Sequence, residues 1–378
     1  MDQVNILVIG GGVVGCAIAA EVSRQRQDVF LVERFPRVGM ATSTRNSGVI
    51  HSGIYYSPGS LKARHCLEGN RLTVAFCKEH QVAHRRTGKL VVAAEESERA
   101  ALEKLYKRGC ENGVEGLRVI GPAEIRSREP HIAGVAALEV PSTGIVSAEE
   151  LVRAYERVAT NHGANIVTRA RVVSLEPAAN GIRAGIRVGD AAHGDAELME
   201  TVEARCVINA TGLYADEVAS MIGNRSWKIY PVRGEYCEVR GPQSLLVKGL
   251  VYPLPHADGL TLGMHFTRTI WETLLIGPTA RYVEEKDDYE RDRLTTADFV
   301  EGARKLLPEI RESDLQLAYS GLRPKLAPPG EHHAADFVIE RDPAVPQMIH
   351  LVGIESPGLT AAPSIAMQVG EMVGEILN

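Results

Sequence analysis

The feature that most constrains the fold is a glycine-rich turn close to the start of the chain. Val4 to Ile9 form a short apolar run, and Val13 to Arg26 carry helical periodicity. Between them, and running into the helix, the sequence GGGVVG of residues 10–15 fits the pattern G-x-G-x-x-G. A second apolar run, Val29 to Val32, follows the helix. This order is that of a βαβ unit, so the sequence predicts an α/β chain with a parallel sheet.

Each glycine of this pattern has a physical role in binding a dinucleotide. Gly10 permits the tight turn, Gly12 lets the backbone approach a pyrophosphate, and Gly15 lets the helix pack close to the strand. The phosphates then lie at a helix N-terminus, where free N–H groups favour anions. Glu33, at the end of the second strand, is placed to accept hydrogen bonds from a ribose. A glycine-rich turn with a surface glutamate is the alternative, and the pattern by itself does not distinguish NAD from FAD.

Two later segments favour FAD. Asn209 to Gly212, NATG, end a strand with small residues that would let the chain pass close to the same dinucleotide. Gly353 to Thr360, GIESPGLT, lead into a helix predicted for Ala361 to Leu377 and make a second loop-to-helix anion site. A reduced flavin carries negative charge near N1 and the C2 carbonyl, which a helix N-terminus stabilises. A nicotinamide enzyme has little need for such a second site.

The length and the strand pattern predict two lobes. The chain has 378 residues, more than one simple core usually supports. Trp227 to Pro278 change to a series of β-like runs between two α/β portions. We predict a Rossmann-like FAD-binding lobe, discontinuous in sequence, with an inserted β-rich antiparallel substrate lobe. The expected boundaries are 1–80, 144–225 and 320–378 for the FAD-binding domain, and 81–143 and 226–319 for the substrate domain.

Composition narrows the class of protein further. Apolar residues make up 44% and charged residues 24%, with a net charge of -6 and both signs interspersed, so a nucleic-acid partner is not expected. No apolar run approaches a membrane span of about 18 residues, and the start MDQVNILVIGGG has no basic n-region. The six cysteines have no CxxC or metal-finger spacing, which favours a reducing compartment. We therefore expect a cytoplasmic protein without a transmembrane segment, with peripheral membrane contact left open. His332-His333 after Glu331 fit a proline-rich loop better than a metal site, so no metal is expected.

Directly after the βαβ unit stands Ser43 to Tyr56, STRNSGVIHSGIYY, which is too polar for a core strand and too poor in helix formers for a helix. Together with GGGVVG, Glu33, NATG and GIESPGLT, this segment resembles the FAD-dependent D-amino-acid oxidase superfamily, whose members oxidise amines or hydroxy acids. The runs NSGVIHSGIYYSPGSLKA, PVRGEYCEV, YPLP, GMHFT and IGPTA are similar to the L-2-hydroxyglutarate dehydrogenase (oxidase) branch, over nearly the whole chain. GIESPGLTAAPSIA is also similar to proteins resembling FAD-dependent glycerol-3-phosphate dehydrogenases.

The resemblance implies a set of cofactor contacts. Thr42 and Ser43 would bind phosphate, and Asn46 to Val49 would run along the flavin. Arg45 stands where the branch is expected to have a histidine, so residues beside the flavin differ here. The residues expected to contact FAD are Gly10, Gly12, Val13, Val14, Gly15, Glu33, Arg34, Thr42, Ser43, Asn46, Ser47, Gly48, Val49, His51, Val172, Ala210, Thr211, Gly212, Tyr214, Gly321, Arg323, Gly353, Glu355, Ser356, Pro357, Gly358, Leu359 and Thr360.

Two histidines are candidates for the catalytic base. The resemblance places His51 near the reacting ring of the flavin. Oxidation of a hydroxy acid needs a base for the C2 hydroxyl proton while hydride leaves C2 for flavin N5, and histidine, with an ordinary pKa of about 6.5, suits that task. His51 as base, as an FAD contact without proton transfer, and as a bystander remain open. His265, on a probable strand of the substrate lobe, is the rival base, and a structural histidine is its alternative.

Other residues are expected to form the substrate pocket. Arg323, in GLRPKL, matches the arginine that holds the substrate carboxylate in relatives of the superfamily, and its planar fork suits a bidentate carboxylate. A surface salt bridge is the alternative for Arg323. Lys325 could hold a second carboxylate. The expected pocket walls, each with core or rim as its alternative, are Tyr55, Tyr56, Arg233, Tyr236 and Tyr252.

These expectations describe an FAD-dependent oxidoreductase that oxidises a small L-2-hydroxy acid, best represented by L-2-hydroxyglutarate, to the 2-oxo acid. The alternatives are an amine or amino-acid oxidase of the glycine or sarcosine oxidase type, a glycerol-3-phosphate dehydrogenase-like enzyme, and a flavin-binding partner without catalysis. The electron acceptor, whether oxygen, a quinone or an electron-transfer protein, stays open, as do the oligomeric state and covalent attachment of FAD. No cysteine follows Cys237, which excludes a cysteinyl flavin attached from the late part of the chain.

Overall fold

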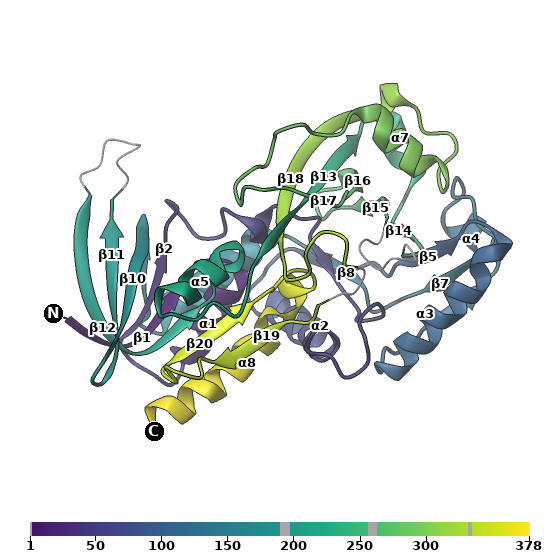
Figure 1. Cartoon of the computed structure of the whole chain (residues 1–378). Helices are drawn as coiled ribbons and strands as arrows, with labels where there is room; N and C mark the ends of the chain where they lie inside the picture. Colours follow the sequence, from purple (N-terminus) through teal and green to yellow (C-terminus); the bar gives the residue numbers. More distant parts are fainter. Residues whose placement is uncertain (1, 190–196, 256–262, 332–334) are drawn as a thin grey trace.

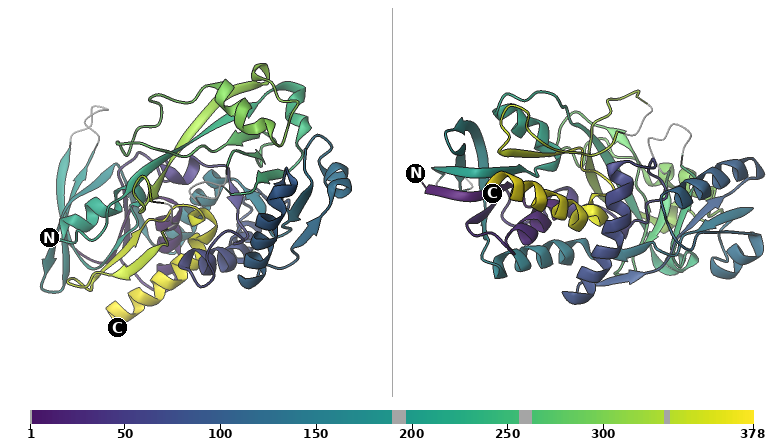
Figure 2. Two further views of the ribbon diagram at one scale, coloured as in Figure 1. Left: turned by 45° about the vertical axis from the view of Figure 1, so that its right-hand side comes forward. Right: turned by 90° about the horizontal axis from the view of Figure 1, so that it is seen from below.

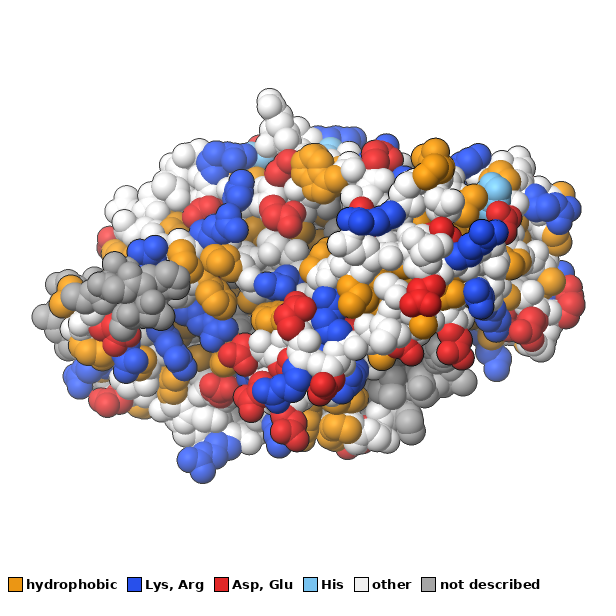
Figure 3. Space-filling view, turned by 90° about the horizontal axis from the view of Figure 1, so that it is seen from above, with side chains coloured by type: hydrophobic (Ala, Val, Ile, Leu, Met, Phe, Trp, Pro, Cys, Tyr) orange, Lys and Arg blue, Asp and Glu red, His pale blue; other side chains and the backbone are white. Residues whose placement is uncertain are grey.

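The computed structural model describes residues 2–189, 197–255, 263–331 and 335–378 and has two lobes, each built on its own sheet (Figure 1). Both termini lie at the end of the molecule formed by the first sheet, as the views in Figure 2 agree. Acidic and basic side chains are interspersed over the face shown in Figure 3, in keeping with the charge pattern of the sequence.

The first sheet contains the predicted βαβ unit. β1 lies at its centre and pairs in parallel with β12 on one side and β2 on the other, β9 continues beyond β2, and β20 pairs in parallel with the end of β12. β10 and β11 add an antiparallel ribbon to the start of β12. The strands are β1 (Asp2–Ile9), β2 (Val29–Glu33), β9 (Asn165–Thr168), β10 (Ala170–Ala178), β11 (Gly181–Val188), β12 (Leu198–Asn209), β19 (Val338–Arg341) and β20 (Met348–Val352).

The register of these strands decides where their loops emerge. Ile9 pairs with both Val32 and Asn209, and Asn209 pairs with His350. The carboxyl ends of β1, β2, β12 and β20 therefore meet at one edge of the sheet, which is where ligands bind in open parallel sheets. The chain segments forming this sheet are far apart in sequence, as expected for a discontinuous lobe.

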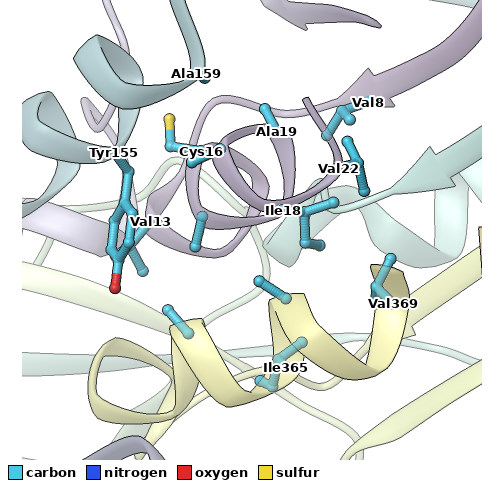
Figure 4. Close-up of a cluster of buried hydrophobic side chains, with 14 of the residues drawn as sticks. Val8, Val13, Cys16, Ile18, Ala19, Val22, Tyr155, Ala159, Ile365 and Val369 are labelled. Carbon is cyan, nitrogen blue, oxygen red and sulfur yellow. The ribbon is translucent and has the colours of Figure 1, made fainter. Parts of the chain in front are cut away.

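Three helices cover one face of this sheet, with α1 packed against both α5 and α8, and Figure 4 shows part of the buried side-chain cluster between them. Their buried faces consist of aliphatic and small residues, with Cys16 and Ile18 of α1 fully buried beside Tyr155 of α5 and Ile365 of α8. Two helix boundaries differ from the sequence prediction, because α1 ends at Val22 instead of Arg26 and α8 begins inside the GIESPGLT segment. The helices are α1 (Val13–Val22), α5 (Ala148–Asn161) and α8 (Gly358–Leu377).

The second sheet is mostly antiparallel, with one parallel pair between β5 and β14. Its order is β17-β13-β16-β15-β14-β5-β7-β6, and β18 pairs with β13. The strands are β5 (Leu90–Ala93), β6 (Arg118–Ile120), β7 (Ala136–Glu139), β13 (Tyr230–Val239), β14 (Leu250–Pro253), β15 (His265–Arg268), β16 (Leu274–Gly277), β17 (Arg281–Tyr282) and β18 (Leu315–Lys325). β18 crosses the predicted domain boundary at residue 320, and the predicted series of β-like runs from Trp227 to Pro278 includes residues 256–262, which lie outside the described residues.

A small third sheet and five further α-helices complete the fold of the described residues. The order of the third sheet is β3-β8-β4. Serine hydroxyls cap two helices, since the Ser60 hydroxyl accepts from the Ala63 N–H and the Ser147 hydroxyl accepts from the Glu150 N–H. The remaining elements are β3 (Val49–Ile50), β4 (His84–Arg86), β8 (Gly144–Val146), α2 (Leu61–Glu79), α3 (Arg99–Glu111), α4 (Pro122–Arg128), α6 (Ala215–Met221) and α7 (Thr296–Arg304).

Candidate active site

A cavity of about 610 Å³ is lined by residues of both lobes. The first sheet contributes the turn after β1 and the ends of β2 and β12, while the second contributes parts of β13, β14, β15 and β18. The predicted site residues that line the cavity are Gly10, Gly12, Val13, Val14, Glu33, Arg34, Thr42, Ser43, Asn46, Ser47, Val49, His51, Tyr55, Tyr56, Val172, Ala210, Thr211, Gly212, Tyr214, Tyr236, Tyr252, His265, Gly321, Arg323, Lys325, Glu355, Ser356, Pro357, Gly358 and Leu359.

At one end of the cavity, the glycine turn has the geometry that its pattern predicts. Gly10 has φ +105°, and a Cβ on it would lie 2.7 Å from the carbonyl oxygen of Ala210. A Cβ on Gly15 would lie 1.9 Å from the carbonyl oxygen of Gly10, so the helix can approach the turn only with glycine there. Gly15 therefore shapes the cavity from behind its wall.

Two polar side chains, those of Ser43 and Glu33, form hydrogen bonds with backbone amides in and next to this turn. The Ser43 hydroxyl accepts a hydrogen bond from the Val13 N–H, the first amide of α1, at 2.8 Å. The Glu33 carboxylate accepts from the N–H groups of Gly11, at 2.7 Å, and Phe35, at 2.9 Å, and burial raises the pKa of this carboxyl. An oxygen acceptor thus already stands at the helix N-terminus, and a buried carboxylate stands where a ribose is expected.

The segment after the βαβ unit passes between the two lobes. The Tyr319 hydroxyl of β18 donates to the Asn46 carbonyl at 2.7 Å, and the Asn46 side-chain oxygen accepts from the Gly48 N–H at 2.8 Å. Gly48 has φ +66°, and a Cβ there would lie 2.4 Å from the Val146 carbonyl oxygen, so this turn requires glycine. Gly48 supports the lining segment without lining the cavity itself.

His51 is fixed by its backbone and leaves one ring nitrogen unpaired. Its N–H donates to the Thr360 hydroxyl at 2.9 Å, and its carbonyl accepts from Asn70 Nδ2 at 2.8 Å. Its Nε2 lies 3.2 Å from Ser356 Oγ, while Nδ1 is buried without a hydrogen-bond partner among the described residues. Burial, and to a smaller degree the charge of Lys89, lowers the pKa of His51 to about 3, so the imidazole is neutral. Thr360 acts here through the His51 backbone and, like Gly353, does not line the cavity.

His265 lies on β15 with a defined tautomer. Its Nδ1 is 3.0 Å from the Gly263 carbonyl, which can only accept, so Nδ1 carries the proton and Nε2 is the acceptor nitrogen. The ring stacks on Tyr252 with centroids 3.7 Å apart. Burial lowers the pKa of His265 to about 3, and the positive charges of Lys89 and Arg323 act in the same direction. The structure thus presents two neutral imidazoles to one cavity.

Arg323 lines the same cavity from β18. Its Nη1 donates to the Thr279 carbonyl at 3.1 Å. A Cβ on Gly234, in the adjacent strand β13, would lie 2.7 Å from Nη2, so this glycine leaves room for the guanidinium. Over the described part of the chain, no carboxylate oxygen lies within the 4.0 Å ion-pair distance of Arg323. The guanidinium is therefore a half-buried cation at the cavity wall.

Lys325 and Glu355 belong to a buried ion cluster with a third residue, Lys62. Lys62 Nζ lies 2.9 Å from one carboxylate oxygen of Glu355, and Lys325 Nζ lies 3.9 Å from the other. Burial raises the pKa of Glu355, but the charges of Lys62, Lys325 and Arg323 outweigh it, and the pKa is lowered overall. Sequence reasoning did not assign Lys62, although it stands inside the quoted run SPGSLKA.

The structure corrects the expectation for Arg233, which does not line the cavity. Its side chain is fully buried on the other face of β13 and pairs with Glu235 at 3.0 Å and Asp288 at 3.1 Å. Because side chains alternate along a strand, Arg233 points away from the site to which its neighbour Gly234 belongs. Arg233 is therefore part of a buried ion-pair network in the core of the second lobe.

Two further cations near the site were missed. Lys89 is buried behind Tyr55 and Tyr252, and its Nζ donates to the Tyr55 hydroxyl at 3.2 Å. Arg108, on α3, lines the cavity and donates to the Tyr55 carbonyl at 3.3 Å. The available signal for Lys89 was a lysine at the head of an apolar strand, KLVVA, where a charge is out of place.

The arrangement fits an extended dinucleotide with a flavin at one end. The cradle at Gly10 has no space for a side chain, and Gly358, the first residue of α8, lines the same cavity as His51. Hydrogen-bond donors at a helix N-terminus favour the anionic side of a reduced flavin. The fold and the site define a flavin-dependent oxidoreductase.

Comparison with known proteins identifies the family. The chain belongs to the FAD dependent oxidoreductase (DAO) family, whose model matches residues 5–372. It is 31% identical to the L-2-hydroxyglutarate dehydrogenase of Indibacter alkaliphilus, over 97% of this chain and 98% of that protein. It is also 31% identical to the glycerol 3-phosphate dehydrogenase of Caloramator mitchellensis, over 98% of this chain and 74% of that protein. Among solved structures, the L-α-glycerophosphate oxidase of Mycoplasma pneumoniae with bound FAD matches with a TM-score of 0.86 and 26% identity, over 99% of this chain and 95% of that one.

The predictions of an FAD cofactor, of an oxidoreductase and of the fold class are confirmed. In the described ranges, no group of three or more His, Cys, Asp or Glu side chains is arranged to hold a metal ion, and His332 and His333 lie outside those ranges. No helix in the part of the chain that the structure describes is both long and apolar enough to cross a bilayer.

Proposed function

We propose that this protein oxidises the C2 hydroxyl of a small L-2-hydroxy acid, with L-2-hydroxyglutarate as the best candidate and 2-oxoglutarate as its product. The observation that carries the proposal is the meeting of Arg323 with two neutral imidazoles, His51 and His265, at one cavity. A carboxylate needs a cation, and an adjacent hydroxyl needs a proton acceptor. Relatives named L-2-hydroxyglutarate dehydrogenase support this choice of substrate.

The chain's own residues orient the acid and hold the proton. Arg323 binds the C1 carboxylate with its planar fork, while its hydrogen bond to Thr279 limits its movement. One imidazole accepts the C2 hydroxyl proton, at Nδ1 of His51 or at Nε2 of His265. Bound FAD supplies the acceptor for the hydride from C2.

The ordinary objection to such a base is its low pKa. Both imidazoles have a pKa of about 3 in the absence of substrate. A bound carboxylate beside the imidazole raises that pKa, because an opposite charge stabilises the protonated form. The binding of the substrate therefore prepares the base, and a neutral ligand of the same shape would not.

Oxidation of glycerol 3-phosphate is the second candidate, since a relative and a similar structure carry that name. Its C2 hydroxyl needs the same base, but its anion is a phosphate. The two candidates differ in which anion the cavity cations must hold.

The test is anaerobic reduction of the purified holoenzyme by a panel of L- and D-2-hydroxyglutarate, glycerol 3-phosphate, glycine and sarcosine. We expect rapid loss of flavin colour with L-2-hydroxyglutarate and with no other member. Reduction by glycerol 3-phosphate alone supports the second candidate, and reduction by an amine refutes hydroxy-acid oxidation. The variants His51→Asn and His265→Asn then identify the base, because only loss of the base slows reduction while substrate binding persists.

A further inference from the structure

A lysine side chain, that of Lys89, is buried behind the part of the cavity wall that the second sheet contributes. Lys89 is 3% exposed, and its Nζ lies 4.3 Å from the ring centroid of Tyr55 and 4.6 Å from that of Tyr252. Its hydrogen bond goes to the Tyr55 hydroxyl, and no carboxylate oxygen of the described residues lies within 4.0 Å. The other buried lysine at the cavity, Lys62, has Glu355 at 2.9 Å. A buried charge without a counter-ion is costly, so Lys89 is expected to serve an anion that arrives from outside.

The hydrogen bond between Lys89 and Tyr55 has a fixed direction. An ammonium group only donates, so the Tyr55 oxygen accepts and its hydroxyl proton is left to be donated elsewhere. Among the described residues, no acceptor takes this proton. Tyr55 lines the cavity, whereas Lys89 lies behind it. The Tyr55 hydroxyl can therefore donate a hydrogen bond into the cavity, and the Lys89 ammonium group, bonded to the same oxygen, polarises it.

The sheet order places Lys89, to which this donor is hydrogen-bonded, on the other side of His265 from Arg323. β18, which carries Arg323, pairs with β13, and the sheet then continues through β16, β15 and β14 to β5, beside which Lys89 stands. His265 is on β15 and stacks on Tyr252 of β14. A ligand with its reacting carbon beside His265 thus has one cation toward each end.

We propose, on the basis of the proposed function, that Tyr55 binds the second carboxylate of a dicarboxylic 2-hydroxy acid and that Lys89 is the positioning residue which polarises its hydroxyl. Arg323 binds the first carboxylate. Lys325, which sequence reasoning assigned to this task, lies on the same strand as Arg323 and 3.9 Å from Glu355. The selectivity of the enzyme for a diacid is then a property of the Lys89–Tyr55 pair.

The experiment compares two substrates of equal length in the holoenzyme. L-2-Hydroxyglutarate ends in a carboxylate, and L-2-hydroxypentanoate keeps C1 and C2 but ends in a methyl group. We expect Lys89→Met to lower the ratio of kcat/KM for the diacid to that for the monoacid about 30-fold, the value of one charge-assisted hydrogen bond. The loss is in KM, with kcat nearly unchanged, and Tyr55→Phe produces a similar loss. Lys107→Met, which removes an exposed lysine charge on α3, is the control and leaves the ratio unchanged.

A binding measurement separates this inference from turnover. Glutarate has no hydroxyl to oxidise, so its binding can be followed by the shift in the absorbance of the oxidised flavin. Glutarate should bind about 30-fold more weakly to Lys89→Met than to the wild type, while butyrate binds both equally. Tyr55→Phe keeps the cation and removes only the hydroxyl, so it tests the pair even if Lys89→Met fails to fold.

The pH dependence of KM provides a further check, because burial lowers the pKa of Lys89 to about 7. As pH rises through this value, the free enzyme loses the charge, and the KM for the diacid should rise while that for the monoacid does not. Among the described residues, the titratable groups that interact with Lys89 through a ring contact or through charge are Tyr55, Tyr252, Cys66, His51 and His265. The two histidines are already neutral near pH 7, and the pKa of each tyrosine and of Cys66 is raised, so Lys89 is the group that titrates there.

The outcomes distinguish the two proposals. A wild type that neither hydroxy acid reduces refutes the proposed function. A wild type that L-2-hydroxyglutarate reduces, with an unchanged diacid preference in Lys89→Met and Tyr55→Phe, overturns this inference alone. If Lys325→Met loses the preference for the diacid and Lys89→Met keeps it, Lys325 binds the second carboxylate. This result also overturns the inference about Lys89 and Tyr55.

Discussion

Replacing Gly15 by alanine should disrupt both the fold of the first lobe and the binding of FAD. The Cβ of the new residue would lie 1.9 Å from the Gly10 carbonyl oxygen, whereas an ordinary contact needs at least 3.4 Å. The neighbouring atom is backbone, so α1 and the turn after β1 must move apart by about 1.5 Å, the difference between these distances. Forced backbone shifts in packed interiors cost about 1–3 kcal/mol or more.

Alanine in a helix interior is more favourable than glycine by about 1 kcal/mol of helix propensity. The control is therefore a glycine-to-alanine change in a helix where the added Cβ meets no close neighbour. Gly370, in α8, has its nearest neighbour, a side-chain carbon of Glu21, at 3.5 Å from an added Cβ. Gly370→Ala should therefore be neutral or stabilising, and Gly15→Ala should be less stable than the wild type by roughly 2 kcal/mol after the same helical gain.

The assay is thermal unfolding of the FAD-free proteins by circular dichroism, followed by titration with FAD. We expect a lower melting temperature and weakened FAD binding for Gly15→Ala, because the amides of α1 leave their position beside Ser43. An unchanged melting temperature and an unchanged FAD affinity in Gly15→Ala would refute the steric argument and, with it, the assigned role of this turn.

Two further predictions concern charge. Arg323→Met should lower kcat/KM for L-2-hydroxyglutarate about 100-fold, since it removes a charge-assisted bidentate contact, and FAD content, measured by absorbance, should persist; equal rates in variant and wild type would exclude Arg323 from carboxylate binding. The pKa values of His51 and His265 are about 3, below the ordinary value near 6.5, so the unfolded state binds protons first on acidification. The stability of the FAD-free protein should therefore decline as pH falls from about 6.5 towards 3, and His51→Asn/His265→Asn should flatten this decline in urea unfolding; an identical decline in the variant would contradict the placement of both rings.

Local signals explain why much of the fold could be predicted from the sequence. The βαβ unit can be predicted because its strands and helix each show a short-range apolar pattern. The roles of Gly10 and Gly15 follow from backbone geometry that only glycine permits. The Ser60 hydroxyl needs only its own helix to act as a cap. The start of α8 was placed too late because Pro357 and Gly358 read as loop residues, although proline is tolerated just before a first helical turn.

The site was harder to predict because its contacts are long-range. Whether Arg233 or its neighbour faces the cavity depends on which face of β13 is covered, and the sequence alternation does not say which. The pairing of Lys325 with Glu355 joins β18 to the segment before α8. Lys89 reads as the polar edge of an apolar strand, and only its packing against Tyr55 and Tyr252 reveals a buried charge. Contacts between residues far apart in the sequence decide all three cases.

The most direct test of the account is the product formed in a single anaerobic turnover. The holoenzyme, mixed with a slight excess of L-2-hydroxyglutarate in the absence of oxygen, should lose its flavin colour and release one 2-oxoglutarate for each flavin reduced, and the D-enantiomer should produce neither change. Flavin that stays oxidised with L-2-hydroxyglutarate, or that is reduced without 2-oxoglutarate being formed, would contradict the central claim.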